Sequence, residues 1–341
     1  MISILVNALK IIFLLGFLIF IHESGHFLVA KFCKIKVKEF AIGFGPTIWK
    51  KQGKETKYAL RLIPLGGFVN MLGEEERSQE EGSFSKASIP KRIAVVLAGG
   101  LVNIVFGLLV YFILMASQSS YYSTTIDTIY DGYAAKESSI VVGDEILAVN
   151  GKRTRFVSDI NKEVQNSNGE EITIKIKRNN ELKYITLIPT EGKDEKTETT
   201  SYKIGVSFKV ADKNFKNNIY YAFWDTVDFS VSIIDNLKEL FTGRISTDQL
   251  MGPVGIAETV SKTQGFFEFV YMLALISLSL GVTNLLPFPP LDGGKIVFLI
   301  IESIRRKPLK EQTEMRIQLA GFAILIALSI YVTYNDILRI F

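Results

Sequence analysis

Four long apolar stretches constrain what this chain can fold into more than any other feature of its sequence. They cover residues 5–30, 93–116, 269–291 and 317–335, and the last three contain no charged residue. Each approaches the roughly 20 residues that a helix needs to cross about 30 Å of hydrocarbon. The first stretch is predicted to be retained, since no small-residue cleavage site follows it. We therefore predict a polytopic α-helical membrane protein with four transmembrane helices.

The basic residues of the connections predict how these helices are oriented. Residues 31–92 carry 13 Lys/Arg against 7 Asp/Glu, and residues 292–316 carry 6 against 4. These two connections lie on the same side of any four-helix arrangement, and the positive-inside rule makes that side cytoplasmic. The long middle connection then lies outside, on the extracytoplasmic side. The overall net charge of only +4 gives no reason to expect binding to nucleic acid.

The sequence His22-Glu23-Ser24-Gly25-His26 carries the chemistry, and it falls in the cytoplasmic half of the first apolar stretch. Residues four apart share a helix face, so both imidazoles can bind one metal ion while Glu23 handles protons. These are the only two histidines of the chain. The alternative is a pair of histidines satisfied within a helix bundle. Ionisable residues inside a membrane span are costly and usually mark a function, which favours the metal site.

A catalytic zinc site usually has three protein ligands, so two histidines leave it incomplete. The single cysteine, Cys33, lies in a basic stretch and is interpreted as an ordinary thiol. The third ligand is predicted to be Asp292, which follows the prolines of Asn284-Leu-Leu-Pro-Phe-Pro-Pro-Leu-Asp-Gly-Gly. If the first and third helices run in the same direction, both histidines and Asp292 reach the same depth. The alternative is a capping role for Asp292 before the two glycines.

These motifs together resemble the site-2 protease family of intramembrane zinc metalloproteases, and most closely its bacterial regulator of sigma-E protease group. Further pieces of the chain fit that family, at residues 43–46, 64–69, 91–92 and 252–256. One departure is Ala98-Gly99-Gly100-Leu101-Val102-Asn103, where the family often has Ala-Gly-Pro-x-x-Asn. The missing proline affects the expected shape of the second helix, but it does not touch the expected metal ligands.

The resemblance implies a zinc metalloendopeptidase (Zn²⁺ bound by His22, His26 and Asp292, with Glu23 as the catalytic base). It implies a multi-pass protein of the bacterial cytoplasmic membrane, with the active site toward the cytoplasm. Its partners would be the lipid bilayer and the transmembrane segments of single-span substrates, such as anti-sigma factors or remnant signal peptides. The alternatives are a membrane zinc protease of the prenyl-protein-processing type and a non-catalytic membrane PDZ scaffold or metal carrier. Glu23 argues against the last, since a purely structural site has no use for it.

The first cytoplasmic connection is predicted to hold a β-hairpin at about residues 40–70. Alternation over 40–45 and 58–69 surrounds a plausible turn at 51–54. Gly66 and Gly67 suit a strand edge that lies close to another backbone, and proteases commonly hold substrates as an added strand. Asn284, whose amide could hold a substrate carbonyl, and Pro287 complete the candidate substrate-binding residues. The alternative is an amphipathic loop lying on the membrane surface.

The middle region is predicted to contain one α+β PDZ domain on the extracytoplasmic side. Short strand-like runs with Gly143-Asp144 and Val149-Asn150-Gly151 are similar to the PDZ domains of bacterial proteases. The predicted parts are residues 1–119 (catalytic core, first part), 120–210 (PDZ domain), 211–264 (amphipathic helix and linker) and 265–341 (catalytic core, second part). The linker helix is expected from apolar residues at helical spacing between Ile219 and Phe241.

Overall fold

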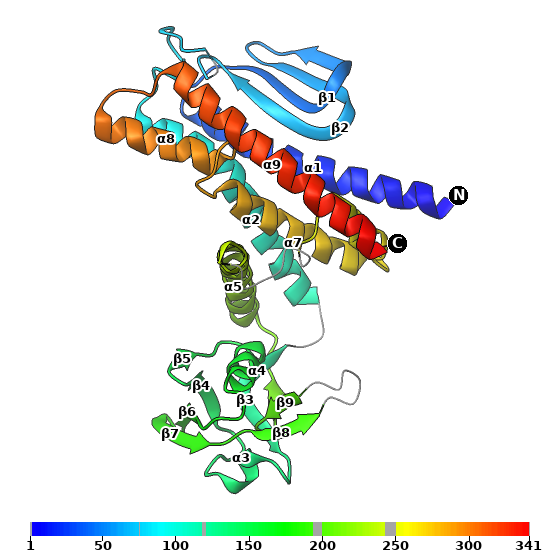
Figure 1. The fold of residues 1–341 in the computed structure, drawn as a ribbon, viewed down its shortest axis with the longest axis vertical. Coiled ribbons are helices and arrows are strands. Elements are labelled where there is room, and N and C mark those ends of the chain that lie inside the picture. Colours follow the sequence, from blue (N-terminus) through cyan, green and yellow to red (C-terminus); the bar gives the residue numbers. More distant parts are fainter. Residues whose placement is uncertain (1, 75, 118–120, 194–199, 243–249, 341) are drawn as a thin grey trace. The chain divides into compact units, whose positions relative to one another are not determined.

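The computed structural model describes the chain except for residues 1, 75, 118–120, 194–199, 243–249 and 341 (Figure 1). The chain forms two compact units. Unit 1 consists of Met1–Leu114 together with Asp225–Phe341, and unit 2 consists of Met115–Trp224. Unit 1 contains the long apolar helices and the motifs described above, and unit 2 contains most of the strands.

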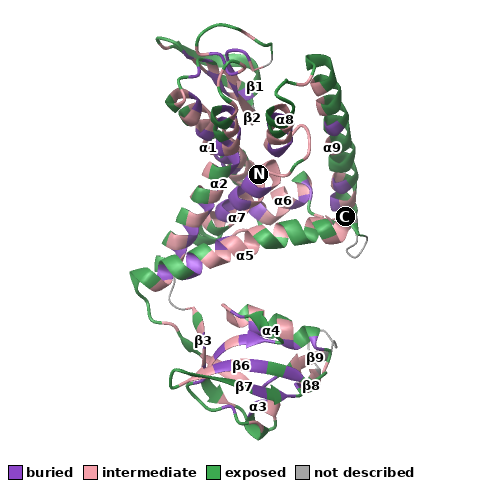
Figure 2. Ribbon diagram, turned by 90° about the vertical axis from the view of Figure 1, so that its left-hand side faces the viewer, coloured by how far each residue is buried: buried purple, intermediate pink, exposed green. Residues whose placement is uncertain are grey.

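Unit 1 is built on four long apolar helices, as the sequence predicts. They are α1 (Ile2–Phe32), α2 (Ile89–Ser117), α7 (Phe266–Asn284) and α9 (Glu311–Ile340). Within the described residues, these four helices are long and apolar enough to cross a membrane. Their outward-facing apolar side chains are largely exposed, above all on α9 (Figure 2). An apolar helix with an exposed surface of this kind is suited to lipid rather than to water.

The third apolar stretch ends earlier than predicted. The expected span of 269–291 is wrong at its C-terminal end, because α7 stops at Asn284 and the next helix, α8 (Asp292–Arg305), begins only after a short irregular segment. Three prolines in that segment explain the difference. Proline lacks the N–H that a helix needs and disfavours helical geometry at the residue before it. As a result, Asp292 stands at the start of a new helix.

Clusters of buried side chains hold the described part of unit 1 together. In one, Leu14 and Leu18 of α1 pack with Leu273 of α7 and with Val260 of the short helix α6 (Pro253–Ser261). In another, residues of α1, α2 and α8 pack with two strands that follow α1. These two strands, β1 (Val37–Gln52) and β2 (Lys57–Met71), pair antiparallel and form a hairpin. The predicted hairpin is therefore present, with a longer first strand than expected.

A buried carboxylate near the end of the chain joins α9 to α6. Asp336 is fully buried and accepts hydrogen bonds from the backbone N–H groups of Gly252 at 3.3 Å and Gly255 at 2.7 Å. Arg339, one turn later on α9, lies 2.8 Å from the same carboxylate. Carboxylates near a helix N-terminus satisfy its free N–H groups and complement its dipole. The last turns of the chain therefore fix the start of α6.

Unit 2 is a curved antiparallel sheet with short helices. The strand order is β10-β3-β4-β6-β7, and β5 pairs with β4. Alternate residues of the central strands point into one core, which contains Ile146, Ile172, Ile174 and Ile176 (Figure 2). The strands are β3 (Tyr122–Ile129), β4 (Glu145–Val149), β5 (Lys152–Arg153), β6 (Ile172–Arg178), β7 (Glu181–Leu187) and β10 (Val206–Val210), with a separate pair β8 (Thr190–Lys193) and β9 (Thr200–Lys203) and the helices α3 (Ala134–Glu137) and α4 (Val157–Asn166).

The amphipathic helix predicted after this sheet is present as α5 (Phe215–Phe241). The boundary between the two compact units falls within it, between Trp224 and Asp225. The sequence places the end of the sheet domain at residue 210. The compact unit extends further, because the first turns of α5 pack on the sheet through aromatic side chains such as Tyr221, whose ring centroid lies 4.1 Å from that of Tyr121.

Candidate metal centre

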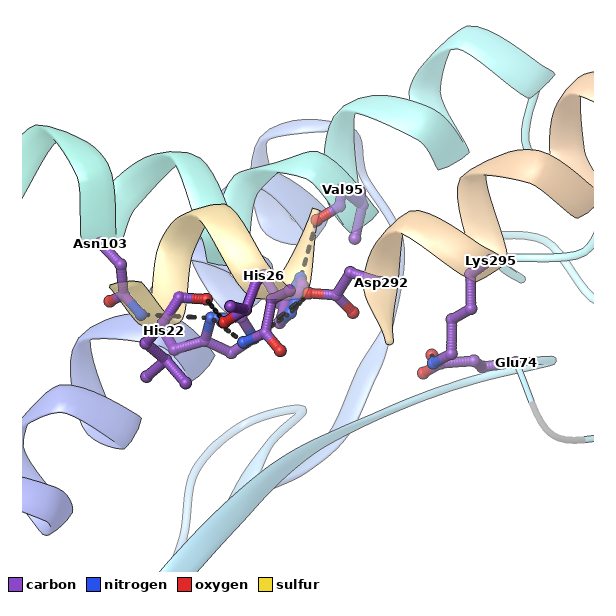
Figure 3. A network of polar contacts seen from close by, with 10 residues as sticks. His22, His26, Glu74, Val95, Asn103, Asp292 and Lys295 are labelled. Atoms are coloured by element: carbon purple, nitrogen blue, oxygen red, sulfur yellow. Dashed lines mark hydrogen bonds and ion pairs between the residues drawn. The ribbon is translucent and has the colours of Figure 1, made fainter. Parts of the chain in front are cut away.

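The two histidines lie one turn apart on α1 and point the same way (Figure 3). His22 Nε2 and His26 Nε2 are 3.2 Å apart, and the ring planes are nearly perpendicular, at 84°. Residues i and i+4 of a helix stand one above the other, which brings the two nitrogens together without any strain in the backbone. Both side chains are almost completely enclosed, with 11% and 12% of their surface exposed.

Asp292, the first residue of α8, completes a group of three ligand atoms. Its Oδ2 lies 3.2 Å from His22 Nε2 and 3.2 Å from His26 Nε2. This oxygen is buried and makes no hydrogen bond to any described residue. Zinc binds nitrogen and oxygen ligands at about 2.0–2.2 Å, and a tetrahedron of that size has edges of about 3.3 Å. The three atoms therefore form a triangle of the size that one face of a tetrahedral zinc site requires.

Glycines let α2 approach the two histidines closely. A Cβ atom on Gly99 would lie 2.4 Å from His26 Nε2 and 2.7 Å from His22 Cε1. On the other side of the contact, a Cβ atom on Gly25 would lie 2.5 Å from the Ala98 carbonyl oxygen. Close backbone approach of this kind is a recurring use of glycine at contacts between membrane helices. Any side chain at Gly99 would occupy the space where the imidazoles meet.

The remaining nitrogen of each imidazole has a partner outside the triangle. His26 Nδ1 lies 2.8 Å from the Val95 backbone carbonyl of α2, so it can only donate to that oxygen. This fixes the tautomer that leaves Nε2 free to bind a metal. His22 Nδ1 lies 3.5 Å from the amide nitrogens of both Asn103 and Asn284. Asn103, on α2, is completely buried (Figure 3).

Glu23 lies beside the triangle without belonging to it. Glu23 directly follows His22 on α1. A Cβ atom on Gly67 of β2 would lie 3.0 Å from Glu23 Cγ. The hairpin therefore closes over the side chain of Glu23. A carboxylate that neighbours a metal site without occupying a ligand position is placed to accept and return protons.

An ion pair between Lys295 and Glu74 joins α8 to the segment that follows the hairpin. Lys295, one turn after Asp292, places its Nζ 2.9 Å from Glu74 Oε1 (Figure 3). The Glu74 carboxylate is the largest influence on this lysine, and it holds the pKa of Lys295 above its usual range. Lys295 is therefore a permanent positive charge close to the site, which complements the negative charges of Glu23 and Asp292.

The candidate substrate-binding residues are not all placed alike. Asn284 reaches His22, and Gly67 lies against Glu23, so the structure brings both to the centre. Gly66 has a φ of +119°, and a Cβ there would fall inside the Phe44 ring, so its glycine is required by packing within the hairpin. Pro287 is exposed, and no contact between it and the metal-binding group is seen among the described residues.

Asn103 is the residue of the site that the sequence did not single out as functional. In the sequence, Asn103 stands out only as part of a motif in the second helix. A buried amide in an otherwise apolar span is costly unless it has a partner, and this cost is the signal that could have identified it. Its partner, His22, becomes visible only when the register of α2 against α1 is known.

The site combines two imidazoles and a carboxylate with a neighbouring glutamate that is not one of the three candidate ligands. This combination is typical of metal-dependent hydrolases of the zinc peptidase class. Comparison with known proteins makes this specific. The chain belongs to peptidase family M50, the site-2 protease family, whose profile matches residues 10–328. It is accordingly a zinc metalloprotease.

Similar proteins extend over nearly the whole chain. A homologue from Clostridium acetobutylicum is 35% identical over 97% of both chains. The zinc metalloprotease RasP of Geobacillus kaustophilus is 30% identical over 100% of both chains. The regulator of sigma-W protease RasP of Bacillus subtilis is 29% identical over 98% of this chain and 99% of its own length.

Proposed function

We propose that this zinc metalloprotease cuts within the membrane-spanning segments of single-span membrane proteins, using His22, His26 and Asp292 as metal ligands and Glu23 as the catalytic base. The observation that carries the proposal is the triangle of ligand atoms with 3.2 Å sides, two of whose three residues lie on a helix of spanning length. A peptide bond can reach this group only if it is presented between apolar helices. Segments that already reside in the membrane meet this condition.

The residues of the chain divide the work of hydrolysis. Zinc, when bound, supplies Lewis-acid polarisation of the scissile carbonyl and lowers the pKa of a water molecule. Glu23 takes the proton from the attacking water and returns it to the leaving amine. The Asn284 amide donates a hydrogen bond to the scissile carbonyl oxygen as negative charge develops on it. Lys295, whose charge also interacts with Glu23 and Asp292, stabilises the added negative charge through space.

The hairpin offers a way to hold an unwound substrate. A two-stranded sheet leaves one edge of each strand unpaired, and β2 passes directly beside Glu23. An extended segment can add to such an edge through main-chain hydrogen bonds, which are independent of sequence. In this proposal, Gly67 matters because it keeps the space between β2 and Glu23 free of a side chain. Gly66 serves the hairpin itself, and Pro287 shapes the segment before Asp292.

We further propose a cytoplasmic active site and an extracytoplasmic unit 2 of the PDZ type. The excess of basic residues in the connection that holds the hairpin supports this orientation. Unit 2 has the antiparallel sheet and two short helices expected of a PDZ-like domain. On the outer side, such a unit would act on the exposed end of a substrate before its membrane segment reaches the metal.

The substrates proposed are anti-sigma factors or remnant signal peptides, since both are single-span proteins whose removal from the membrane requires cleavage within it. A relative that is named as a regulator of sigma-W protease supports the first of these. A prenyl-protein-processing protease would instead take its third metal ligand from a glutamate. The position of Asp292 against both histidines supports the intramembrane protease.

Metal analysis combined with a cleavage assay tests the proposal. Purified wild-type protein should hold about one zinc ion per chain. The substitutions His22→Ala, His26→Ala and Asp292→Ala should each remove both zinc and cleavage of a model single-span substrate. Asp336→Asn serves as a control, because it removes a buried carboxylate elsewhere in unit 1. Full zinc content and full activity in Asp292→Ala would show that the third ligand is assigned wrongly.

A further inference from the structure

The hydrogen-bond partners of His22 Nδ1 do not match the tautomer that zinc binding through Nε2 requires. A neutral imidazole that binds a metal through Nε2 carries its proton on Nδ1, which then needs a hydrogen-bond acceptor. For His26 this acceptor is the Val95 carbonyl oxygen at 2.8 Å. For His22 the two nearest groups are amide nitrogens, those of Asn103 and Asn284, each 3.5 Å from Nδ1. An amide N–H₂ group can only donate, so neither arrangement satisfies an Nδ1–H.

Asn103 carries the other half of this mismatch. Its carbonyl oxygen, Oδ1, is buried and has no hydrogen-bond partner among the described residues, and the residue as a whole is 0% exposed. A buried acceptor without a donor costs about 1–3 kcal/mol. Rotating the amide by 180° exchanges Oδ1 and Nδ2, which have nearly the same size and shape. After the exchange, Asn103 Oδ1 faces the Nδ1–H of zinc-bound His22, for which no other acceptor is seen among the described residues.

We infer that Asn103 is a positioning residue for the metal, whose Oδ1 accepts a hydrogen bond from His22 Nδ1–H in the zinc-loaded enzyme. The inference rests on the proposed metal site. It gives the two histidines equivalent supports on α2, a backbone carbonyl for His26 and a side-chain carbonyl for His22 (Figure 3). Each support fixes the tautomer and the direction of its ring.

The same assignment separates the roles of the two asparagines. Asn284 is only partly buried, and its Oδ1 is not among the buried atoms that lack a partner. Once Asn103 accepts the hydrogen bond from His22, the Asn284 amide is not needed as a partner of that ring. Its N–H₂ group is then available to the substrate carbonyl, as the proposed mechanism requires. Two amides near one imidazole are therefore not redundant.

Zinc affinity of three full-length variants tests the inference. Asn103→Leu, similar in size but without a polar atom, should weaken zinc binding about ten- to hundredfold, as is typical when the partner of a metal-binding histidine is lost. Asn103→Asp keeps an acceptor but loses the N–H₂ donor, and its zinc affinity should stay within about threefold of wild type. Affinity is measured by competition with a chelator, and the visible spectrum of the cobalt-substituted protein reports the ligand geometry.

Ser277→Ala is the matched control. Ser277 is completely buried on α7, and its hydroxyl donates to the Asn103 backbone carbonyl at 2.9 Å, so the change perturbs the same place without touching His22. Zinc affinity and the cobalt spectrum should stay at wild-type values in this variant. Should Asn103→Leu fail to fold, judged by its melting transition, Asn103→Ala takes its place.

Two outcomes would overturn the inference. One is wild-type zinc affinity in the folded apolar variant. The other is a loss in Asn103→Asp as large as in Asn103→Leu, which would mean that the N–H₂ group is what matters. Failure of the metal site itself gives a different result, because His22→Ala would then bind zinc as wild type does.

Discussion

At the scale of single residues, the proposed role of Glu23 separates metal binding from catalysis. Glu23 lies next to the ligand triangle, beneath the hairpin, and occupies no ligand position. We expect Glu23→Gln to keep its zinc and to lose cleavage by about 10²–10⁴-fold, because an amide cannot shuttle protons at neutral pH. Zinc content and single-turnover cleavage are measured on one preparation. Loss of zinc in this variant would instead make Glu23 a ligand.

Asn284 should behave differently from the ligands. We expect Asn284→Ala to keep its zinc and nearly its melting temperature, while cleavage slows about 10²–10³-fold, the usual effect of removing one donor to a developing oxyanion. A purely structural hydrogen bond between helices would lower the melting temperature together with activity. A parallel fall in zinc content, melting temperature and cleavage would therefore rule out contact with the substrate.

Residue types and spacing predict most of the candidate centre. The i, i+4 spacing of His22 and His26 holds on any helix, and Asp292 follows prolines that must end one. The support of His22 by Asn103 was not predictable in this way. It depends on which residue of α2 stands opposite α1, and that register is set by the contact of Gly25 with Ala98 and of Gly99 with the imidazoles. Spacing along the chain carries no information about contacts between two helices.

At the scale of secondary-structure elements, the close approach of α2 to α1 shapes the proposed metal centre. We expect Gly99→Ala to weaken zinc binding roughly tenfold or more, because its Cβ would lie 2.4 Å from His26 Nε2 and the ring must move. Isothermal titration with zinc measures the change.

Gly107→Ala on the same helix is the control for Gly99→Ala. Its Cβ would press on the Leu278 side chain at 2.5 Å, away from the histidines. Overpacking of this kind costs about 1–3 kcal/mol and should lower the melting temperature while leaving zinc affinity unchanged. Equal zinc losses in the two variants would mean that the glycines act through helix packing in general.

A buried ion pair stabilises the sheet of unit 2. Asp144 is fully buried, and its two oxygens each lie 2.7 Å from a nitrogen of Arg178. Burial opposes ionisation, but hydrogen bonds from Arg178 and from the Val141 N–H outweigh it and lower the pKa of Asp144 below its usual range. Its stabilisation is therefore present above about pH 4, the ordinary pKa of an unfolded aspartate, and is lost as the pH falls through the lower folded value.

Amide-exchange protection of β4 and β6 measures this contribution in the full-length protein. We expect Asp144→Asn to reduce the protection of β4 and β6 at neutral pH by more than a surface substitution does, since it removes the carboxylate that pairs with Arg178. The difference from wild type should shrink below about pH 4. Lys152→Gln, which breaks an exposed pair with Glu163, should change protection by less than about 1 kcal/mol. A pH-independent difference would contradict the assignment to Asp144 ionisation.

Among the elements, the length of an apolar stretch predicts where a helix lies better than it predicts where that helix ends. The four apolar stretches all became helices, but α7 ends seven residues before the apolar run does. Hydrophobicity continues through Pro287 to Leu291, while backbone geometry does not allow the helix to continue. The length of β1 differs from the prediction for a related reason, since residues 45–52 are all exposed and show no alternation of buried and exposed side chains.

At the scale of the whole molecule, the orientation in the membrane is the main expectation. Cys33 is the only cysteine, so a Cys33→Ala background allows single cysteines to be placed at exposed positions in each unit. We expect Ser158→Cys in unit 2 to react with a membrane-impermeant maleimide in intact cells, and Lys54→Cys in the hairpin turn to react only after permeabilisation. The reverse pattern would invert the proposed topology.

The separation of the proposed metal ligands along the sequence has a consequence for the time at which the enzyme becomes active. Ribosomes make a chain from its N-terminus, so the two histidines are made long before Asp292. The proposed metal centre draws its ligands from the first and the last fifth of the sequence. A nascent chain that has not yet reached Asp292 therefore lacks the complete centre. The membrane is in this way protected from a half-made protease.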